Sequence, residues 1–162
     1  MSDSMHLRGV SGWLLLLVLG LCVLGPFVGA GQQMREFKSV EELTPSLLQA
    51  TNWAHYKLSI WLAYICSSGL GFIAGYQLWK VHRPESVSFA IKILWARALV
   101  LAVGQYIATL AAFGQESAVT LLPEISRGSI LSCAVAMIWT LYLLRSHRVK
   151  NTYGATHFVI GP

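Results

Sequence analysis

Four long apolar blocks limit what this chain can fold into. They run over residues 12–30, 58–79, 93–113 and 128–144. Among Lys, Arg, Asp and Glu residues, only Arg97 falls within these blocks. A helix needs about 20 residues to cross the ~30 Å hydrocarbon layer of a membrane. Because lipid offers no hydrogen bonds to the backbone, each block is expected to be helical. We therefore predict four transmembrane helices over residues 12–30, 58–79, 86–113 and 128–144.

The composition favours a membrane protein over a soluble domain. Only 12% of the 162 residues are charged, against about 25% in ordinary soluble domains, and the mean hydropathy is +0.57. We expect an all-α fold, a polytopic bundle forming one membrane domain over residues 1–162. Residues 31–57 are expected to be an outer segment and residues 145–162 a cytoplasmic tail.

The first block has an alternative interpretation as a secretory signal peptide. Arg8 precedes it, and the small residues of Val28 to Ala30 fit a cleavage site. The block is longer than the apolar region of roughly 7 to 15 residues that such signals carry. Pro26 near its end is tolerated in a membrane helix. A retained transmembrane helix is the favoured interpretation.

The distribution of Lys and Arg predicts the orientation, because cytoplasmic connections carry the excess of these cations. Both termini in the cytoplasm places six of them inside, namely Arg8, Lys80, Arg83, Arg145, Arg148 and Lys150. The two outer connections then hold four cations, Arg35, Lys38, Lys57 and Arg127, together with five Glu residues. This count favours both termini in the cytoplasm.

The two ends of the chain carry a family resemblance. The first helix opens with Gly12, Trp13, Leu14 and Leu15, and the last is followed by the run Ser146 to Tyr153, which reads Ser-His-Arg-Val-Lys-Asn-Thr-Tyr. The chain thereby resembles the small bacterial inner-membrane proteins catalogued as domain of unknown function 2569. The resemblance implies a four-helix fold and a bacterial inner-membrane location. It implies no activity, because the family has none established.

Two interpretations of the tail remain. Arg145, Arg148 and Lys150 lie next to the end of the last apolar block, where each cation adds about 1 kcal/mol of attraction to anionic head groups. Charge alone does not explain Val149 between two cations, or Thr152 before Tyr153. The alternative is a tail docked in a fixed site on the bundle or on a partner, with these uncharged residues buried or hydrogen-bonded.

The outer segment has its own helix signals. Ser39 and Glu42 match a capping box, and Thr44 before Pro45 is a second helix start. Apolar and small residues then recur at helical spacing as far as Leu58. These signals predict a short amphipathic outer helix, with a partner-binding cap as the functional alternative.

Within the predicted helices, few side chains are candidates for binding. Arg97 lies close enough to one end of its helix that it is expected to reach the head groups, while the deeper Gln105 is expected to bond a neighbouring helix. Ser67, Gly71 and Gly75 form a small-x-x-x-small stripe, which indicates close packing inside the bundle or against a second copy or another subunit.

The sequence indicates no catalytic centre. No acidic residue falls within the four blocks, and Cys22, Cys66 and Cys133 lie singly in three of them. We expect no metal, cofactor or nucleic acid, and a lipid bilayer with anionic head groups as surroundings. The leading hypothesis is a non-catalytic accessory or interaction subunit of a membrane complex. A small channel or carrier acting as a homo-oligomer is the first alternative, and a membrane enzyme is the second.

Overall fold

The computed structural model describes residues 12–154. Arg8 and residues 155–162 of the predicted tail lie outside the described residues. The elements in chain order are α1 (Trp13–Leu19), a π-helical turn η2 (Gly20–Leu24), α2 (Gly25–Leu43), a 3-10 helix η3 (Pro45–Gln49), α3 (Thr51–Lys80), α4 (Pro84–Thr120), α5 (Leu122–Arg145) and α6 (His147–Tyr153).

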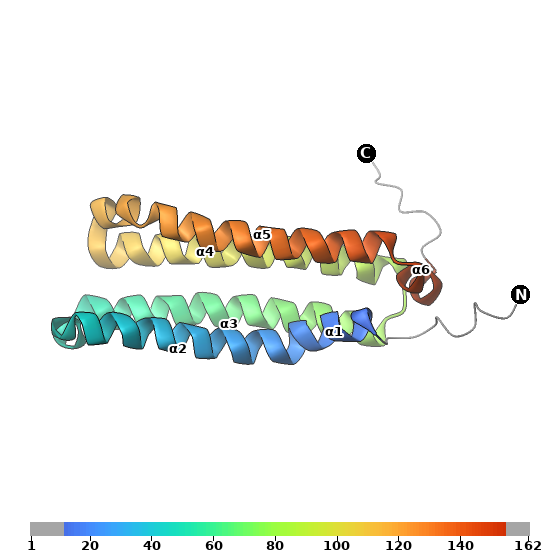
Figure 1. Cartoon of the computed structure of the whole chain (residues 1–162), viewed down its shortest axis with the longest axis horizontal. Coiled ribbons are helices and arrows are strands. Elements are labelled where there is room, and N and C mark those ends of the chain that lie inside the picture. The colour runs from blue at the N-terminus through green and yellow to red at the C-terminus, as the bar shows by residue number, and fades with distance from the viewer. Residues whose placement is uncertain (1–11, 155–162) are drawn as a thin grey trace, which may run out of the picture.

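Within residues 12–154, four helices are long and apolar enough to cross a membrane. They are Trp13–Leu43, Thr51–Lys80, Pro84–Thr120 and Leu122–Arg145, and they alternate in direction along the bundle (Figure 1). The prediction of an all-α, multi-pass bundle is confirmed. We call one end of the bundle the tail end; it contains Gly12, the connection 81–83 and α6. We call the opposite end the loop end; it contains residues 44–50 and Leu121.

Pro26 accounts for the π-turn inside the first span. Proline lacks the backbone amide of a regular helical turn, and widened turns are a common way to accommodate such a loss. The Gly25 amide bonds the Gly20 carbonyl, and a Cβ at Gly25 would lie 2.6 Å from that oxygen. The Tyr64 hydroxyl donates a 2.5 Å hydrogen bond to the Pro26 carbonyl oxygen. The first span is therefore fastened to α3 where it is irregular.

The spans pack mainly on their neighbours in the chain. α1 and η2 pack on α3, α3 packs along α4, and α4 packs along α5. At the tail end, a core of side chains from all four spans and α6 closes the bundle, with Leu14, Leu78, Val87 and Leu143 each fully buried. Toward the loop end, α2 and α5 face each other across an open space that side chains of both helices line.

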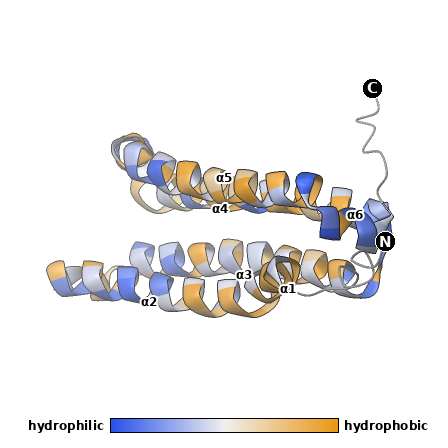
Figure 2. Ribbon diagram, turned by 45° about the vertical axis from the view of Figure 1, so that its right-hand side comes forward, coloured by the Kyte–Doolittle hydropathy of each residue, from blue (hydrophilic) through white to orange (hydrophobic). Residues whose placement is uncertain are grey.

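The polar segment after the first block is more helical than the sequence indicates. α2 continues to Leu43, so Ser39 lies inside a helix and caps nothing. The expected amphipathic helix is reduced to the 3-10 helix Pro45–Gln49, and α3 already begins at Thr51. Gln, Met, Arg, Lys and Glu are good helix formers, which allows the first helix to continue into the polar segment. Figure 2 shows these hydrophilic residues toward the loop end of α2.

The third span starts at Pro84, two residues before its predicted start, and the fourth span also starts early. α4 bends at Gly114, whose φ of 82° is a conformation that favours glycine. Its regular part therefore ends at Phe113, which is the predicted end. α5 begins at Leu122, six residues before the predicted start, with Pro123 in its first turn, where a missing amide costs little.

Candidate functional site

The last described helix, α6, is docked on the tail end of the bundle. Val149 exposes 0% and Tyr153 1% of its surface, and both belong to the core shared by the four spans. The Tyr153 hydroxyl donates a 2.5 Å hydrogen bond to the Leu78 carbonyl oxygen in α3. The Tyr153 ring stacks on His82 with 5.8 Å between ring centroids. The tail therefore contacts both α3 and the connection that follows it.

The order of residues in the tail signature suits a docked helix. Val149 and Tyr153 are four residues apart, which places them on one face of a helix. Lys150 and Asn151 between them are exposed, while Thr152 is half-buried. Gly154, with a φ of 67°, ends the helix in the left-handed conformation that glycine adopts readily. This is the arrangement that the docking interpretation of the tail requires.

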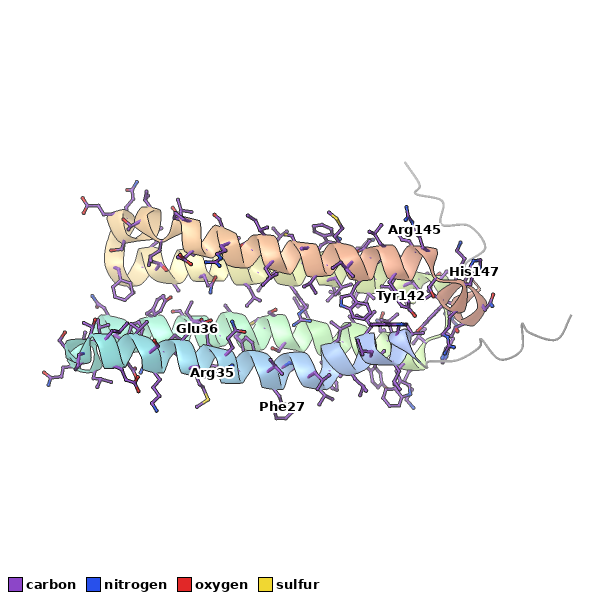
Figure 3. All side chains as sticks on the ribbon, in the orientation of Figure 1. Phe27, Arg35, Glu36, Tyr142, Arg145 and His147 are labelled. Carbon is purple, nitrogen blue, oxygen red and sulfur yellow. The ribbon has the colours of Figure 1, made fainter. Side chains whose placement is uncertain are left out.

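The three cations of the tail have different surroundings. Arg145 and Lys150 are exposed, and Figure 3 shows Arg145 pointing away from the bundle. Arg148 is half-buried, and its Nη1 lies 3.6 Å from where a Cβ would stand at Gly12. Arg148 therefore lies against the start of the first span. Arg145 and Lys150 are the two cations that point outward, as contact with lipid head groups requires.

Burial also changes the acidity of Tyr153. Removal from water, followed by the neighbouring Tyr142, raises the pKa of Tyr153 to about 12. Burial disfavours the charged phenolate, so the hydroxyl keeps its proton at neutral pH. A hydrogen bond to a carbonyl oxygen requires that proton. The environment and the bond to Leu78 therefore favour the same protonation state.

The small-residue stripe of α3 lies inside the bundle. Ser67 exposes 1% of its surface, and Gly71 and Gly75 are buried. A Cβ at Gly75 would lie 2.4 Å from the Cys22 Sγ of the first span, and one at Gly71 would lie 2.7 Å from the Arg97 Nη1 of α4. The first span thus approaches α3 closely at Gly75, and α4 approaches it closely one turn away at Gly71. In this chain it serves internal packing.

Arg97 is held between two helices. Its Nε donates a 3.4 Å hydrogen bond to the Ser67 hydroxyl, and its guanidinium lies over Gly71. It is 13 residues from Pro84, so at 1.5 Å per residue it is about 20 Å along α4 from the tail end. The sequence favours a side chain that reaches the head groups. The structure instead packs the guanidinium against α3, because the glycine at position 71 leaves room for it.

Gln105 lines an open cavity rather than bonding a neighbouring helix. We call this cavity of about 910 Å³ the vestibule; its polar lining comes from all four spans and includes Gln32, Glu36, Tyr56, Gln105, Glu124 and Arg127. Figure 3 shows Glu36 on α2, the helix that borders the space toward α4 and α5, while Phe27 points away. The vestibule lies toward the loop end, where α2 and α5 separate.

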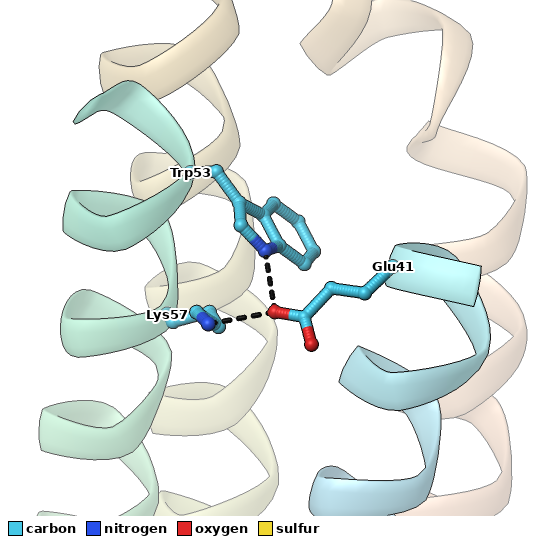
Figure 4. A network of polar contacts seen from close by, with 3 residues as sticks. All are labelled: Glu41, Trp53 and Lys57. Atoms are coloured by element: carbon cyan, nitrogen blue, oxygen red, sulfur yellow. Dashed lines mark hydrogen bonds and ion pairs between the residues drawn. The ribbon is translucent and has the colours of Figure 1, made fainter. Parts of the chain in front are cut away.

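A polar network at the loop end joins the first span to α3. One oxygen of Glu41, Oε1, accepts a 2.8 Å hydrogen bond from the Trp53 indole and a 2.7 Å charged bond from Lys57 (Figure 4). Phe37 meets Trp53 edge-on beside it, with 5.8 Å between ring centroids. Sequence reasoning placed Trp53 and Lys57 at the membrane surface but missed Glu41 and Phe37. Phe37 and Glu41 are four residues apart, and this spacing could have indicated that both lie on one face of a helix.

These features define a class of protein: a multi-pass helical membrane protein with a docked terminal helix and a vestibule at the opposite end. Residues 7–154 match the model of a family described as a protein of unknown function, DUF2569. The chain belongs to this family, as the resemblance at its two ends indicates. No curated protein and no solved structure matches the chain.

Proposed function

We propose that this chain is a non-catalytic interaction subunit of a membrane complex, and that its vestibule receives a polypeptide segment of the partner. The observation that carries this proposal is the opening between α2 and α5. Both helices contribute charged side chains to it, Glu36 from α2 and Glu124 and Arg127 from α5. Polar side chains that face each other without packing form a binding surface that a second chain can complete.

The size and lining of the vestibule suit a polypeptide. Its volume of about 910 Å³ is at the upper end of the range of roughly 300 to 1,000 Å³ for small-molecule clefts, and it is open along one side. Its lining mixes both signs of charge with the amides of Gln32 and Gln105. Such a lining matches the varied side chains and backbone of a peptide better than a single small ligand.

The proposed location is the bacterial inner membrane, with the tail end in the cytoplasm. Four exposed cations support this orientation, namely Lys80, Arg83, Arg145 and Lys150, all at the tail end. Cytoplasmic connections are enriched in such residues. Anionic head groups of the inner leaflet are then the expected contacts of Arg145 and Lys150, while Val149 and Tyr153 hold the helix on the bundle.

Native purification tests the interaction. The full chain is extracted in mild detergent, and its complexes are measured by native mass spectrometry. We expect a partner protein in stoichiometric amount. Glu124→Gln with Arg127→Gln changes two charges that line the vestibule, and should remove that partner. Lys38→Gln with Glu42→Gln is the matched control, because it removes an exposed ion pair at the same end and leaves the net charge equally unchanged. Retention of the partner by the vestibule variant contradicts the proposed binding surface.

Cysteine labelling tests the orientation. In a variant with Cys22, Cys66 and Cys133 replaced, single cysteines are placed at Leu48 in the loop-end connection and at Asn151 in α6, both exposed. An impermeant maleimide applied to intact cells should label position 48 and not position 151. The reverse pattern would invert the proposed topology, and labelling of both would contradict the three crossings that the spans place between positions 48 and 151.

A small carrier acting as a homo-oligomer is the second candidate. The observation in its favour is that polar lining continues from the vestibule into the bundle, through a cavity of about 290 Å³ bordered by Glu36, Gln105 and Ser132. A carrier predicts that the purified chain alone moves a solute into proteoliposomes and runs as a dimer. The interaction subunit predicts neither. A membrane enzyme, the third candidate, has no geometric observation in its favour among residues 12–154.

A further inference from the structure

Arg97 is a membrane-embedded cation without a counter-charge in the described chain. The ion pairs within residues 12–154 are Lys38–Glu42 and Lys57–Glu41, so no carboxylate there lies within 4.0 Å of Arg97. The structure gives its guanidinium one hydrogen bond, from Nε to the neutral Ser67 hydroxyl. A guanidinium has five N–H donors in a planar fork. Ionisable residues within membrane spans are costly and commonly mark binding sites or pathways.

A cavity borders Arg97 on the side of α5. We call it the inner cavity; it measures about 270 Å³ and lies between α4 and α5. Its lining is apolar apart from Arg97 and Ser132, with Leu94 and Leu101 from α4 and Val135 from α5. One cation and one hydroxyl set in an apolar wall suit a small molecule that has an anionic group and an apolar body.

The inner cavity adjoins a second cavity, which in turn adjoins the vestibule. Leu101 and Ser132 line both the inner cavity and the adjoining cavity of about 290 Å³. That adjoining cavity shares Glu36 and Gln105 with the vestibule. The three spaces therefore follow one another from the loop end to Arg97. Arg97 is the cation at the inner end of this series of cavities.

We propose that the inner cavity is a binding site for a small organic anion, with a carboxylate or phosphate on the Arg97 guanidinium. The Ser132 hydroxyl lines the same space as the polar group, and the apolar body of the ligand packs on Leu101 and Val135. Paired guanidinium–carboxylate bonds are among the stronger hydrogen bonds in proteins, and their planar geometry distinguishes Arg from Lys. This site is separate from the partner surface at the mouth of the vestibule.

Benzoate is the soluble probe for this site. Binding of radiolabelled benzoate is measured on the full chain in phosphatidylcholine nanodiscs. Arg97→Gln should weaken binding by about tenfold or more, as expected for the loss of a charged hydrogen bond, and Arg97→Lys should bind with intermediate affinity. Lys92→Gln is the control, because Lys92 is an exposed cation on the same helix and lies outside the inner cavity; its affinity should equal that of the wild type.

A second variant covers the case in which Arg97→Gln does not fold. Ser132→Phe fills the inner cavity while keeping Arg97, and should abolish benzoate binding with unchanged circular dichroism. The source of the natural anion is tested by adding phosphatidylglycerol to the nanodiscs. If phosphatidylglycerol competes with benzoate, the natural anion is an acidic lipid head group. If it does not compete, the natural anion is a soluble acid. Benzoate binding that depends on Arg97 supports an anion site in both cases. Benzoate binding that is undetectable in the wild type, or equal in the wild type, Arg97→Gln and Ser132→Phe, overturns the proposal.

Discussion

The hydroxyl of Tyr153 bonds the carbonyl oxygen of Leu78 across 75 residues of sequence. Leu78 lies in the last turn of α3, where the carbonyls of a helix have no partner within the helix. Gln77 in the same turn accepts the backbone amide of Val81. Tyr153 thus supplies a partner for an otherwise unpaired carbonyl, and the tail completes the end of α3.

Tyr153→Phe should therefore loosen the tail without removing its packing. The variant leaves the Leu78 carbonyl buried and unpaired, which costs about 1 to 3 kcal/mol. Limited proteolysis of α6 in detergent should become faster, while the four spans stay helical by circular dichroism. Asn151→Ala, an exposed change on the same helix, is the control. Unchanged proteolysis in Tyr153→Phe would mean that the bond contributes nothing to docking.

High pH should release the same helix. An unfolded tyrosine ionises near pH 10, whereas the pKa of Tyr153 is about 12. A raised folded pKa gives a contribution to stability that is complete below the unfolded value and disappears as pH rises through the folded value. Proteolysis of α6 should thus accelerate between about pH 10 and 12. The difference in absorbance at 295 nm between wild type and Tyr153→Phe should titrate near pH 12; a difference that titrates near pH 10 contradicts a buried hydroxyl.

Buried and exposed residues of the tail should have separable effects. Val149→Ser with Thr152→Ala places an unpaired hydroxyl in the core, at a cost of about 1 to 3 kcal/mol, and should expose α6 to protease. Arg145→Gln with Lys150→Gln should leave α6 protected, and should only weaken a salt-sensitive attraction to anionic vesicles. Equal protection of Val149→Ser, Thr152→Ala and wild type would leave lipid attraction as the whole explanation of the tail.

Gly75 should be less tolerant of substitution than Gly69 in the same helix. A methyl group at Gly75 meets the Cys22 Sγ at 2.4 Å, so Gly75→Ala should destabilise the bundle by about 1 to 3 kcal/mol. Adding Cys22→Ala should restore much of the loss, because it removes the atom in conflict. Gly69→Ala, with no atom within 4 Å, should be neutral or stabilising. Thermal unfolding in detergent measures all four proteins; an equal loss in Gly69→Ala would attribute the effect to the helix rather than to packing.

The number of spans could be predicted from the sequence, and so could the docking of the tail as one of two interpretations. Both depend on local residue patterns. Runs without charge mark the spans, and the uncharged Val149 and Thr152 among the cations of the tail favour docking over attraction to lipid alone. The helical extension of α2 into the predicted outer segment was missed, because hydropathy registers the end of the membrane and not the end of a helix. Residues up to Leu43 remain helical with no apolar signal to show it.

The surroundings of Arg97 and the vestibule could not be predicted from one sequence. The direction of the Arg97 side chain depends on the space over Gly71, which belongs to another helix. The vestibule exists because α2 and α5 separate toward the loop end, and no local pattern records which helices fail to meet. Sequence reasoning identified Arg97 and Gln105 as candidates but could not give the position or size of the cavities beside them.

The docking of α6 also has a consequence for biosynthesis. The chain emerges from the ribosome starting at its first residues, so the four spans are made before Tyr153 exists. Until then the Leu78 carbonyl and the core around Leu14 and Leu143 lack the side chains that cover them. A chain cut short before α6 would contain all four spans of residues 12–154 and still expose this apolar surface. Docking of α6 therefore covers an apolar surface that the four described spans leave open by themselves, and a chain that ends before α6 is expected to be degraded faster than one that contains it.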